Sequence, residues 1–576
     1  MKQNTVRCMV LSLLFLGVSI VFAQTPAKYW VQFKDKQGTA YRIDKPEEFL
    51  SPRAIMFRQL NNIPIDELDL PVSEVYVRQV LSLDSSNWQC TRSKWLNGIV
   101  FYSEDADILE KVRALPFVEE AECVIKMDTV ERQPVVAFYY DKMQDNPNLK
   151  VTHTLLDDVA AGDFDYGRAS VQVKMNNAHW LHRMGYHGEG MQMMILDGGF
   201  EHVDTISFFS RLRDDQRLLG GCNVVEPGVS HFEKHNHGTM VLSCIASYAP
   251  GKLVGTAPMV QVYLCQTEDS RSETKVEEDF WVSGVEWADY LGCQVLNSSL
   301  GYTRFDDTIA QPRAYEDLNG KVSRASRAAT IAASKGMIIC NSAGNEGSAK
   351  WHYIGTPADA KDILTVGAVM ANGSPAPFSS FGPTADGRLK PDACAVGMMA
   401  AVCNGKGKNS FAAGTSFASP ILAGMVACLW QAFPEKSNFE IMDAVRKSGS
   451  ALDHSDNQMG YGIADFLKAY NILRNQSYAD AGVYFSDYAP EKLKNGKWQT
   501  MATVYYSAPN NGSLNFSVKS GNKLKVKRIS HVAARDAHVV FYRITFPPLK
   551  KGEKYRVEEM NVQCGGKPFS FVFGLE

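Results

Sequence analysis

The stretch Ser410-Phe411-Ala412-Ala413-Gly414-Thr415-Ser416-Phe417-Ala418-Ser419-Pro420 has the pattern of a tight turn that leads into a buried helix. Gly414 permits a close backbone approach in the turn. Pro420 falls near the start of the helix, where a proline costs little because the first N–H groups have no intrahelical partners. Beyond Ser416 the apolar residues recur at a helical period, with small residues between them. The apolar positions are Phe417, Ile421, Leu422, Met425, Val426 and Leu429.

Ser416 stands at the expected N-terminus of that helix. The free N–H groups and the dipole at such an end favour negative charge. A serine that attacks a carbonyl and forms an oxyanion is well placed there, but serine is also a favoured N-cap. On this stretch alone, capping is the simpler interpretation, and a catalytic role requires partners elsewhere in the chain.

The chain has 576 residues, which is too many for a single hydrophobic core, so two to four domains are expected. Hydrophobic residues make up 45% of it and charged residues 21%, as in an ordinary globular protein. The formal net charge is −3, and there is no long basic run. We therefore expect no nucleic-acid partner.

Residues 1–23 are predicted to be a secretory signal peptide. Lys2 and Arg7 form a positive start, the run from Cys8 to Phe22 is almost wholly apolar, and cleavage is expected after Ala23. The run is shorter than about 18 residues, which argues against a membrane anchor, and no later stretch is long enough to span a bilayer. These features predict export across the inner membrane, to the periplasm, the cell surface or the medium, with no transmembrane segment.

The chain contains twelve cysteines, of which eleven remain once Cys8 is removed with the signal peptide. Export permits disulfides. Most of the cysteines lie in apolar runs, where a small buried thiol is the expected state. Spacing alone assigns no pairs, and there is no CxxC metal pattern.

Residues 24–127 are predicted to form a small α+β domain. Strand-like runs at both ends enclose helix-like stretches, including one from Pro46 to Gln59, and a strand pair from Trp88 to Tyr102. Residues 128–165 have weaker periodicity and several turn residues, which is typical of a linker.

Residues 166–475 alternate short apolar runs with helical stretches. This alternation predicts an α/β domain with a mostly parallel sheet covered by helices on both faces. Ligand sites in such sheets lie at the carboxyl ends of the strands. Residues 480–576 have strand-like runs separated by turn residues, which predicts a C-terminal β-sandwich.

An apolar run from Met191 to Leu196 ends in Asp197-Gly198-Gly199. Asp197 is therefore expected at the carboxyl end of a strand, half-buried, where an unpaired carboxylate is costly. A turn-forming aspartate is the alternative interpretation.

His237 is expected to open a helix whose inner face carries Met240, Val241, Cys244 and Ile245. Two further histidines, His231 and His235, precede it, so a zinc site formed by the three imidazoles is an alternative to a general base. Only His237 has the helix-start position, and the spacing reveals no obvious fourth ligand.

Two more strand ends carry polar or small residues. Ser299, Leu300 and Gly301 follow one apolar run, and an extended peptide can pair with such an exposed edge. Another run ends in a glycine-rich turn that projects Asn345, whose amide can donate to an oxyanion. Together these residues offer the carboxylate, imidazole, hydroxyl and oxyanion donor that a Ser–His–Asp mechanism divides among its groups.

With these motifs the sequence resembles the subtilisin-like serine peptidases, the subtilase family. The resemblance covers about residues 166–473, and the order Asp, His, Ser along the chain is that of the family. It rests on Ile195-Leu196-Asp197-Gly198-Gly199, His237-Gly238-Thr239-Met240-Val241, Asn297-Ser298-Ser299-Leu300-Gly301, Ala343-Gly344-Asn345-Glu346-Gly347 and Gly414-Thr415-Ser416-Phe417-Ala418-Ser419-Pro420.

The resemblance implies a secreted serine endopeptidase with Ser416 as nucleophile, His237 as base and Asp197 as its orienting carboxylate. It further implies Asn345 and the Ser416 amide as oxyanion donors. Ser299, Leu300 and Gly301 would line the substrate, and Gly355 would form the floor of a deep specificity pocket suited to large apolar side chains, with Glu346 near its rim. Gly198-Gly199 and the extra histidines depart from the common family pattern. Calcium sites are common in the family but none is recognisable, so neither a cofactor nor a metal is expected.

Residues 28–127 resemble the propeptides of such enzymes, which implies a precursor inhibited by its own N-terminal domain and processed within residues 128–165. The expected partners are protein or peptide substrates and this propeptide. Two other functions stay open on the sequence: a catalytically silent binding protein with the same fold, and a zinc-dependent hydrolase that uses the histidine loop.

Overall fold

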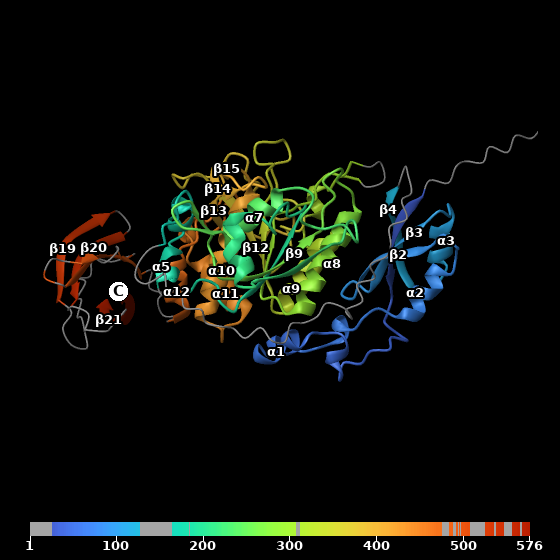
Figure 1. The fold of residues 1–576 in the computed structure, drawn as a ribbon, viewed down its shortest axis with the longest axis horizontal. Coiled ribbons are helices and arrows are strands. Elements are labelled where there is room, and N and C mark those ends of the chain that lie inside the picture. The colour runs from blue at the N-terminus through green and yellow to red at the C-terminus, as the bar shows by residue number, and fades with distance from the viewer. Residues whose placement is uncertain are drawn as a thin grey trace, which may run out of the picture.

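A computed structural model describes residues 26–126, 164–183, 185–306 and 311–474, together with the strands between residues 483 and 575. The predicted signal peptide and nearly all of the predicted linker lie outside the described residues. Figure 1 shows an N-terminal unit beside a central α/β unit, with the C-terminal strands on the opposite side of the α/β unit.

The N-terminal unit is a four-stranded sheet with helices on one face. The strand order is β2-β3-β1-β4, and β1 pairs antiparallel with both of its neighbours. Side chains of β1 alternate, so that Val31 and Phe33 pack under the helices of this unit while Trp30 faces the α/β unit. This arrangement agrees with the predicted α+β domain. The elements are β1 (Ala27–Phe33), α2 (Glu74–Leu81), β2 (Trp88–Ser93), β3 (Gly98–Ser103), α3 (Ile108–Arg113) and β4 (Val118–Lys126).

The helix predicted from Pro46 to Gln59 is interrupted. A short 3-10 turn at Pro46–Glu48 is followed by α1 (Pro52–Leu60), which begins after Ser51. A proline disfavours the helical conformation in the residue before it, and the Ser51 hydroxyl accepts a hydrogen bond from the N–H of Ala54 as an N-cap. The segment therefore restarts at Pro52, which the apolar periodicity alone did not indicate.

The α/β unit is built on a seven-stranded sheet in the order β13-β12-β11-β10-β5-β9-β6. All six pairings between these strands are parallel, as the alternation of strands and helices predicted. The strands are β5 (Gln192–Asp197), β6 (Leu218–Asn223), β9 (Gln261–Gln266), β10 (Val295–Ser298), β11 (Ile338–Ser342), β12 (Leu364–Val369) and β13 (Ala393–Val396).

Helices cover both faces of this sheet. On β5, Met193 and Ile195 contact the layer that contains α7 (His237–Ala246) and α10 (Thr415–Ala432). Met194 and Leu196 contact the opposite layer, which contains α8 (Val276–Leu291) and α9 (Arg324–Ser334). Both faces of β5 are thus buried, which explains its uninterrupted apolar run.

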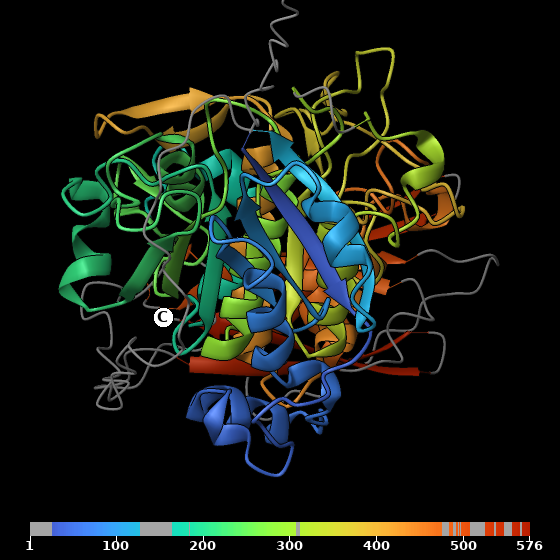
Figure 2. The ribbon, with the colours of Figure 1, turned by 90° about the vertical axis from the view of Figure 1, so that its right-hand side faces the viewer.

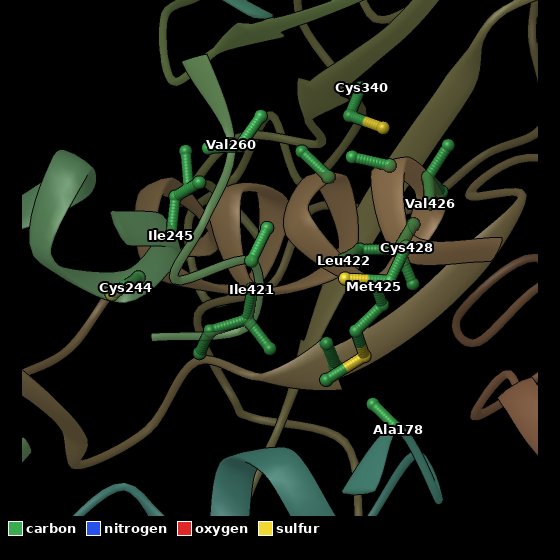
Figure 3. Close-up of a cluster of buried hydrophobic side chains, with 14 of the residues drawn as sticks. Ala178, Cys244, Ile245, Val260, Cys340, Ile421, Leu422, Met425, Val426 and Cys428 are labelled. Carbon is green, nitrogen blue, oxygen red and sulfur yellow. The ribbon is translucent and has the colours of Figure 1, made fainter. Parts of the chain in front are cut away.

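Helix α10 runs through the core, and Figure 3 shows its side chains Ile421, Leu422 and Met425 among residues from the surrounding elements. Of the helices in the described ranges, α10 alone is long and apolar enough to cross a membrane, and 89% of its 18 residues are buried inside the fold. The stretch just before it, predicted as a turn, is largely the strand β15 (Asn409–Ala412), which forms a hairpin with β14 (Ala400–Cys403).

The remaining elements of this unit are short or peripheral. They are α4 (Ser170–Lys174), α5 (His179–Arg183), α6 (Ser210–Asp214), β7 (Tyr248–Ala249), β8 (Leu253–Val254), α11 (Asn438–Lys447) and α12 (Phe466–Arg474).

The C-terminal region is made of antiparallel strands, as its sequence predicted. One sheet has the order β16-β18-β20-β19 with β17 paired to β18, and β21 pairs with β22 in a separate hairpin. The packing of two sheets into a sandwich rests on side chains outside the described residues, so the β-sandwich stays a prediction. The strands are β16 (Val483–Asp487), β17 (Glu491–Lys492), β18 (Trp498–Tyr506), β19 (Lys525–Ala534), β20 (Ala537–Phe546), β21 (Arg556–Cys564) and β22 (Lys567–Leu575).

The N-terminal sheet lies against helices α8 and α9, as the end-on view in Figure 2 shows. The carboxylate of Glu286 on α8 accepts hydrogen bonds from the N–H groups of Lys94 and Trp95 at 2.9 and 3.1 Å. At the other end of the contact, Arg324 on α9 pairs with Asp279 and with Glu122 of β4. Buried charges in the α/β unit are thus matched by groups of the N-terminal unit.

A second contact is made by the segment between β1 and α2, which carries α1 below the α/β unit in Figure 1. Arg58 of α1 forms buried ion pairs with Asp69 and with Asp289 of α8, at 3.2 and 2.5 Å. Lys94 also pairs with Asp289 at 2.7 Å, and Lys335 of the α/β unit pairs with Asp69 at 2.8 Å. Each unit therefore contributes both cations and anions to one buried cluster.

Candidate active site

Asp197 is the last residue of the interior strand β5, as predicted, and its side chain is fully buried. Its carboxylate accepts a hydrogen bond from the N–H of Gly198 at 2.8 Å. The Nδ1 atom of His237 lies 2.8 and 3.0 Å from the two carboxylate oxygens. The structure thus joins the predicted carboxylate and imidazole, forty residues apart in the chain, into one pair.

His237 is the first residue of α7, and its side chain is 26% exposed. Burial lowers the pKa of its imidazole, but the charge of Asp197 and the hydrogen bond to it outweigh burial, so the pKa lies above its ordinary value. Because Nδ1 is occupied by Asp197, Nε2 is the nitrogen left to exchange a proton with a reacting group.

Gly199 explains the departure from the common family pattern after Asp197. Its φ of 143° is rarely adopted by residues with a side chain, and a Cβ there would lie 2.0 Å from the carbonyl oxygen of Lys234. The histidine loop therefore runs directly over this glycine on its way to His237.

Ser416 lies in the first turn of α10 and is 8% exposed. Gly414 before it has a φ of 154°, which lets the chain turn from β15 into the helix. The ring of Phe417 has its centroid 5.7 Å from that of His237, so the start of α10 lies next to the imidazole. The residue that follows the predicted nucleophile therefore lies beside the predicted base.

The hydroxyl of Ser416 donates to the carbonyl oxygen of Ser299 at 3.3 Å. Among the hydrogen bonds of the described residues, none joins Ser416 to His237. Such bonds are often long or unmade in the absence of substrate. In this structure the serine hydroxyl is therefore bonded to the backbone that follows β10 and not to His237.

Asn345 follows β11, as predicted, and its side chain is exposed. Its Oδ1 atom accepts hydrogen bonds from the N–H and the hydroxyl of Thr415 at 2.9 and 3.1 Å. These two bonds fix the amide so that Nδ2 is the atom available to a substrate beside the start of α10.

Ser299 and Leu300 follow β10, next to β5 in the sheet, and the Ser299 hydroxyl donates to the carbonyl oxygen of Ser416 at 2.8 Å. Gly301, the third residue of the predicted substrate edge, is exposed. Gly355 is buried, and a Cβ added to it would lie 2.9 Å from Thr303 Oγ1. A Cβ added to Gly344 would lie 3.8 Å from the N atom of Gly355. Gly355 is thus close to the turn that carries Asn345.

A pocket of about 370 Å³ adjoins the Asp197–His237 pair, and sequence reasoning missed it. Its wall includes Glu268, Glu273 and Glu277, whose carboxylates approach within 4.8 Å of one another. Burial is the main cause that raises the pKa of Glu273 to about 7 and that of Glu277 to about 8. In the sequence Glu268 and Glu273 stand among charged and polar neighbours from Thr267 to Lys275, which is typical of a solvated loop.

The three histidines considered for zinc do not form a metal-binding group among the described residues; the three glutamates are the only such group there. His235 and His237 have ring centroids 6.4 Å apart, and Nδ1 of His237 is paired with Asp197. Burial lowers the pKa of His231 to about 4, and its ring packs against Phe232 instead. The site therefore favours the general-base role of His237 over the zinc alternative.

Comparisons with known proteins agree with this geometry. Residues 188–462 match the model of the subtilase family (peptidase S8), and residues 28–137 match that of the peptidase S8 propeptide domain of Bacteroidota. The thermostable alkaline protease of Halalkalibacterium halodurans is 23% identical over 351 residues, which are 61% of this chain and 82% of that protein. Subtilisin DY of Bacillus licheniformis is 26% identical over 287 residues, 49% of this chain and 92% of that protein.

Among solved structures, an epidermin leader peptide processing serine protease of Staphylococcus aureus is 15% identical, with a TM-score of 0.49, over 78% of this chain and all of that one. The two family models together cover the N-terminal unit and most of the α/β unit. The propeptide model agrees with the α+β fold of the N-terminal unit. The chain thus belongs to the subtilase family of serine endopeptidases and carries an N-terminal propeptide domain of the peptidase S8 type.

Proposed function

We propose that the protein is an exported serine endopeptidase in which Asp197, His237 and Ser416 form the catalytic triad. Asp197 holds the imidazole through Nδ1, and Nε2 takes the proton of the Ser416 hydroxyl as its oxygen attacks the peptide carbonyl. The Asn345 amide and the N–H of Ser416 stabilise the resulting oxyanion. His237 then protonates the leaving amine, and water hydrolyses the acyl-enzyme ester.

The observation that carries this proposal is the pair of short contacts from His237 Nδ1 to Asp197, next to a serine in the first turn of a buried helix. A buried carboxylate is costly unless it is paired, and a histidine with only a structural role on a helix does not require one as a partner. In this proposal the Ser416 hydroxyl leaves Ser299 and turns to His237 when a substrate carbonyl approaches.

We further propose that peptide or protein substrates bind as an extended strand along Ser299, Leu300 and Gly301, with Gly355 at the floor of the specificity pocket. The edge after β10 is supported by the exposure of Gly301. Because Gly355 has no side chain, the pocket in this proposal is deep, with the Thr303 hydroxyl beside its floor, and it takes a large apolar side chain of the substrate.

The N-terminal domain, in this proposal, inhibits the enzyme until the chain is cut between Ile125 and Asp165 by the peptidase itself. The matched charges and the apolar contact with α8 and α9 support a stable precursor. The cutting site and the signal peptide of residues 1–23 lie outside the described residues.

The decisive variant is Ser416→Ala, with Ser410→Ala on strand β15 as the matched control. We expect Ser416→Ala to lower kcat by about six orders of magnitude and to abolish labelling by a fluorophosphonate probe, while the α/β unit stays folded. Ser410→Ala should be labelled and active like the wild type. Residual activity of Ser416→Ala within tenfold of the wild type would remove Ser416 from the mechanism.

The same pair of variants tests maturation. Expressed in a host without related peptidases, the wild type and Ser410→Ala should lose the N-terminal domain, and Ser416→Ala should keep it. A folded wild type that neither hydrolyses peptides nor reacts with the probe would instead indicate a binding protein, and inhibition by chelators alone would indicate a metal-dependent hydrolase.

A further inference from the structure

Two cysteines lie side by side on neighbouring strands of the main sheet. Cys222 of β6 is the direct partner of Cys265 of β9 in the parallel ladder. Their sulfur atoms are 3.1 Å apart. Neighbouring strands are separated by about 4.8 Å, which lies within the Cα separation of about 4.4–6.8 Å that a disulfide bridges. The pairing therefore places the two residues at a spacing that a disulfide can span.

This pair is distinct from the other thiols. Among the ten cysteines whose side chains the structure describes, only Cys222 and Cys265 bring two sulfur atoms into hydrogen-bond contact. Cys244 and Cys428, for example, are buried in the helical layer around α10 (Figure 3) and contact backbone oxygens. Each thiol of this pair therefore has a second thiol within reach, whereas no hydrogen bond of the described residues joins Cys244 or Cys428 to another sulfur.

The two thiols also differ in access. Cys222 is half-buried and Cys265 is fully buried. Burial, together with the neighbouring sulfur of Cys222, raises the pKa of Cys265 well above its ordinary value. Cys222 is therefore the thiol that meets an external oxidant first, and Cys265 lies directly behind it.

We propose that Cys222 and Cys265 form a cross-strand disulfide when the chain meets an oxidant of the disulfide class, such as a dithiol oxidase or oxidised glutathione. The Cys222 thiolate attacks one sulfur of that disulfide and releases the other as a thiol. Cys265 then loses its proton and attacks the Cys222 sulfur, so that the oxidant leaves fully reduced. Two electrons and two protons pass to the oxidant, and one S–S bond is formed in the protein.

The bond would fasten the two loops that border the active site. The segment of 42 residues between Cys222 and Cys265 contains the histidine loop, His237 and all of α7. After β6, the N–H of Val224 donates to Gln266 O at 2.9 Å, and after β9 the N–H of Thr267 donates to Asp197 O at 3.0 Å. The cross-link thus lies two residues from the main-chain bond that holds the backbone of Asp197.

The chemistry can be tested on purified full-length protein, independently of peptidase activity. Ser416→Ala protein, reduced and then equilibrated with oxidised glutathione, is unfolded in the presence of the alkylating agent, digested without reductant and measured by mass spectrometry. We expect one cross-linked peptide pair that joins Cys222 to Cys265 and lacks two hydrogen atoms, while Cys244 and Cys428 are found alkylated. The thermal midpoint should rise by roughly 5–10 °C, because a closed loop of this length restricts the unfolded chain.

Two variants in the same background make the test specific. Cys222→Ala should lose both the cross-link and the gain in thermal midpoint, and Cys403→Ala, which removes a buried thiol from β14, should keep both. The proposal is overturned if Cys222 and Cys265 are both alkylated as separate thiols after oxidation. It is also overturned if Cys222 stays bound to glutathione or pairs with a different cysteine.

Discussion

At the scale of single residues, the amide group of Asn345 is held in one orientation by Thr415. Both bonds from Thr415 go to its amide oxygen, which leaves the nitrogen available to donate to the oxyanion of the proposed mechanism. We expect Asn345→Ala to lower kcat by about 10²–10³ with little change in KM, because the ground-state carbonyl scarcely uses this donor. Steady-state kinetics on one peptide substrate measure both terms.

The control for that variant is Asn372→Ala, an exposed turn residue far along the chain, which should leave both constants unchanged. If KM rises in Asn345→Ala while kcat is kept, Asn345 is a binding residue and not an oxyanion donor.

In the proposed mechanism the pH dependence of activity is set by His237, which must be neutral to accept the serine proton. Although burial lowers its pKa, the Asp197 carboxylate outweighs burial and raises the pKa above the usual value of about 6.5. The kcat/KM should therefore fall on the acid side with an apparent pKa above about 6.5. In Asp197→Asn the residual activity should titrate at a lower pH, and a wild-type profile flat down to about pH 4.5 is incompatible with a histidine base.

At the scale of elements, the first turn of α8 carries Glu277, whose burial raises its pKa and makes the stability of the fold depend on pH. Burial, with a contribution from Glu273, raises the pKa of Glu277 from 4.5 to about 8, so the folded chain keeps a proton that the unfolded chain releases. The stability contributed by the protonated form is complete below about pH 4.5 and is lost as the pH rises to about 8.

Replacing this residue by the neutral Glu277→Gln should therefore flatten the dependence of the thermal midpoint on pH in that window. The measurement is best made in Ser416→Ala protein, where self-digestion is absent. Glu435→Gln, which removes a carboxyl group from an exposed loop, is the matched control and should follow the parent curve. Identical slopes for Glu277→Gln and its parent would show that Glu277 is ionised in the folded chain.

At the scale of the whole molecule, the buried charge cluster under the N-terminal domain holds two units together. Burial acts to raise the pKa of Asp289, but the charges of Lys94 and Arg58 outweigh burial and lower the pKa to about 2. The carboxylate is therefore charged at neutral pH. Asp289→Asn leaves both cations buried without that charge, and we expect a loss of about 3–5 kcal/mol in the Ser416→Ala precursor. Thermal or urea unfolding of the precursor measures this loss.

Asp443→Asn breaks an ion pair with Lys447 on the surface of α11, where the aspartate is 54% exposed, and should have almost no effect. After removal of the N-terminal domain, Asp289→Asn enzyme should have the kcat/KM of the wild type. Equal losses for the two precursor variants would show that the cluster does not stabilise the contact between the units.

Much of this architecture follows from local patterns. The apolar run before Asp197, the helix start at His237 and the small-residue helix after Ser416 each have a periodicity that is visible in the printed sequence. The parallel sheet follows from their alternation, and the family motifs predict the catalytic residues because carboxylate, imidazole and hydroxyl must follow strand or helix ends to meet.

Other features depend on contacts between distant segments, and no local pattern encodes them. Three features arise only when separate strands and helices pack together. They are the contact of α1 with the α/β unit, the acidic pocket beside His237 and the short distance between Cys222 and Cys265. The charges near Glu273 look like those of a solvated loop until tertiary burial raises their pKa. The sequence by itself therefore determined the elements and the chemical groups at their ends, and only the tertiary structure decided which charges are buried, which are paired and which thiols meet, because burial and distance are properties of the packed chain.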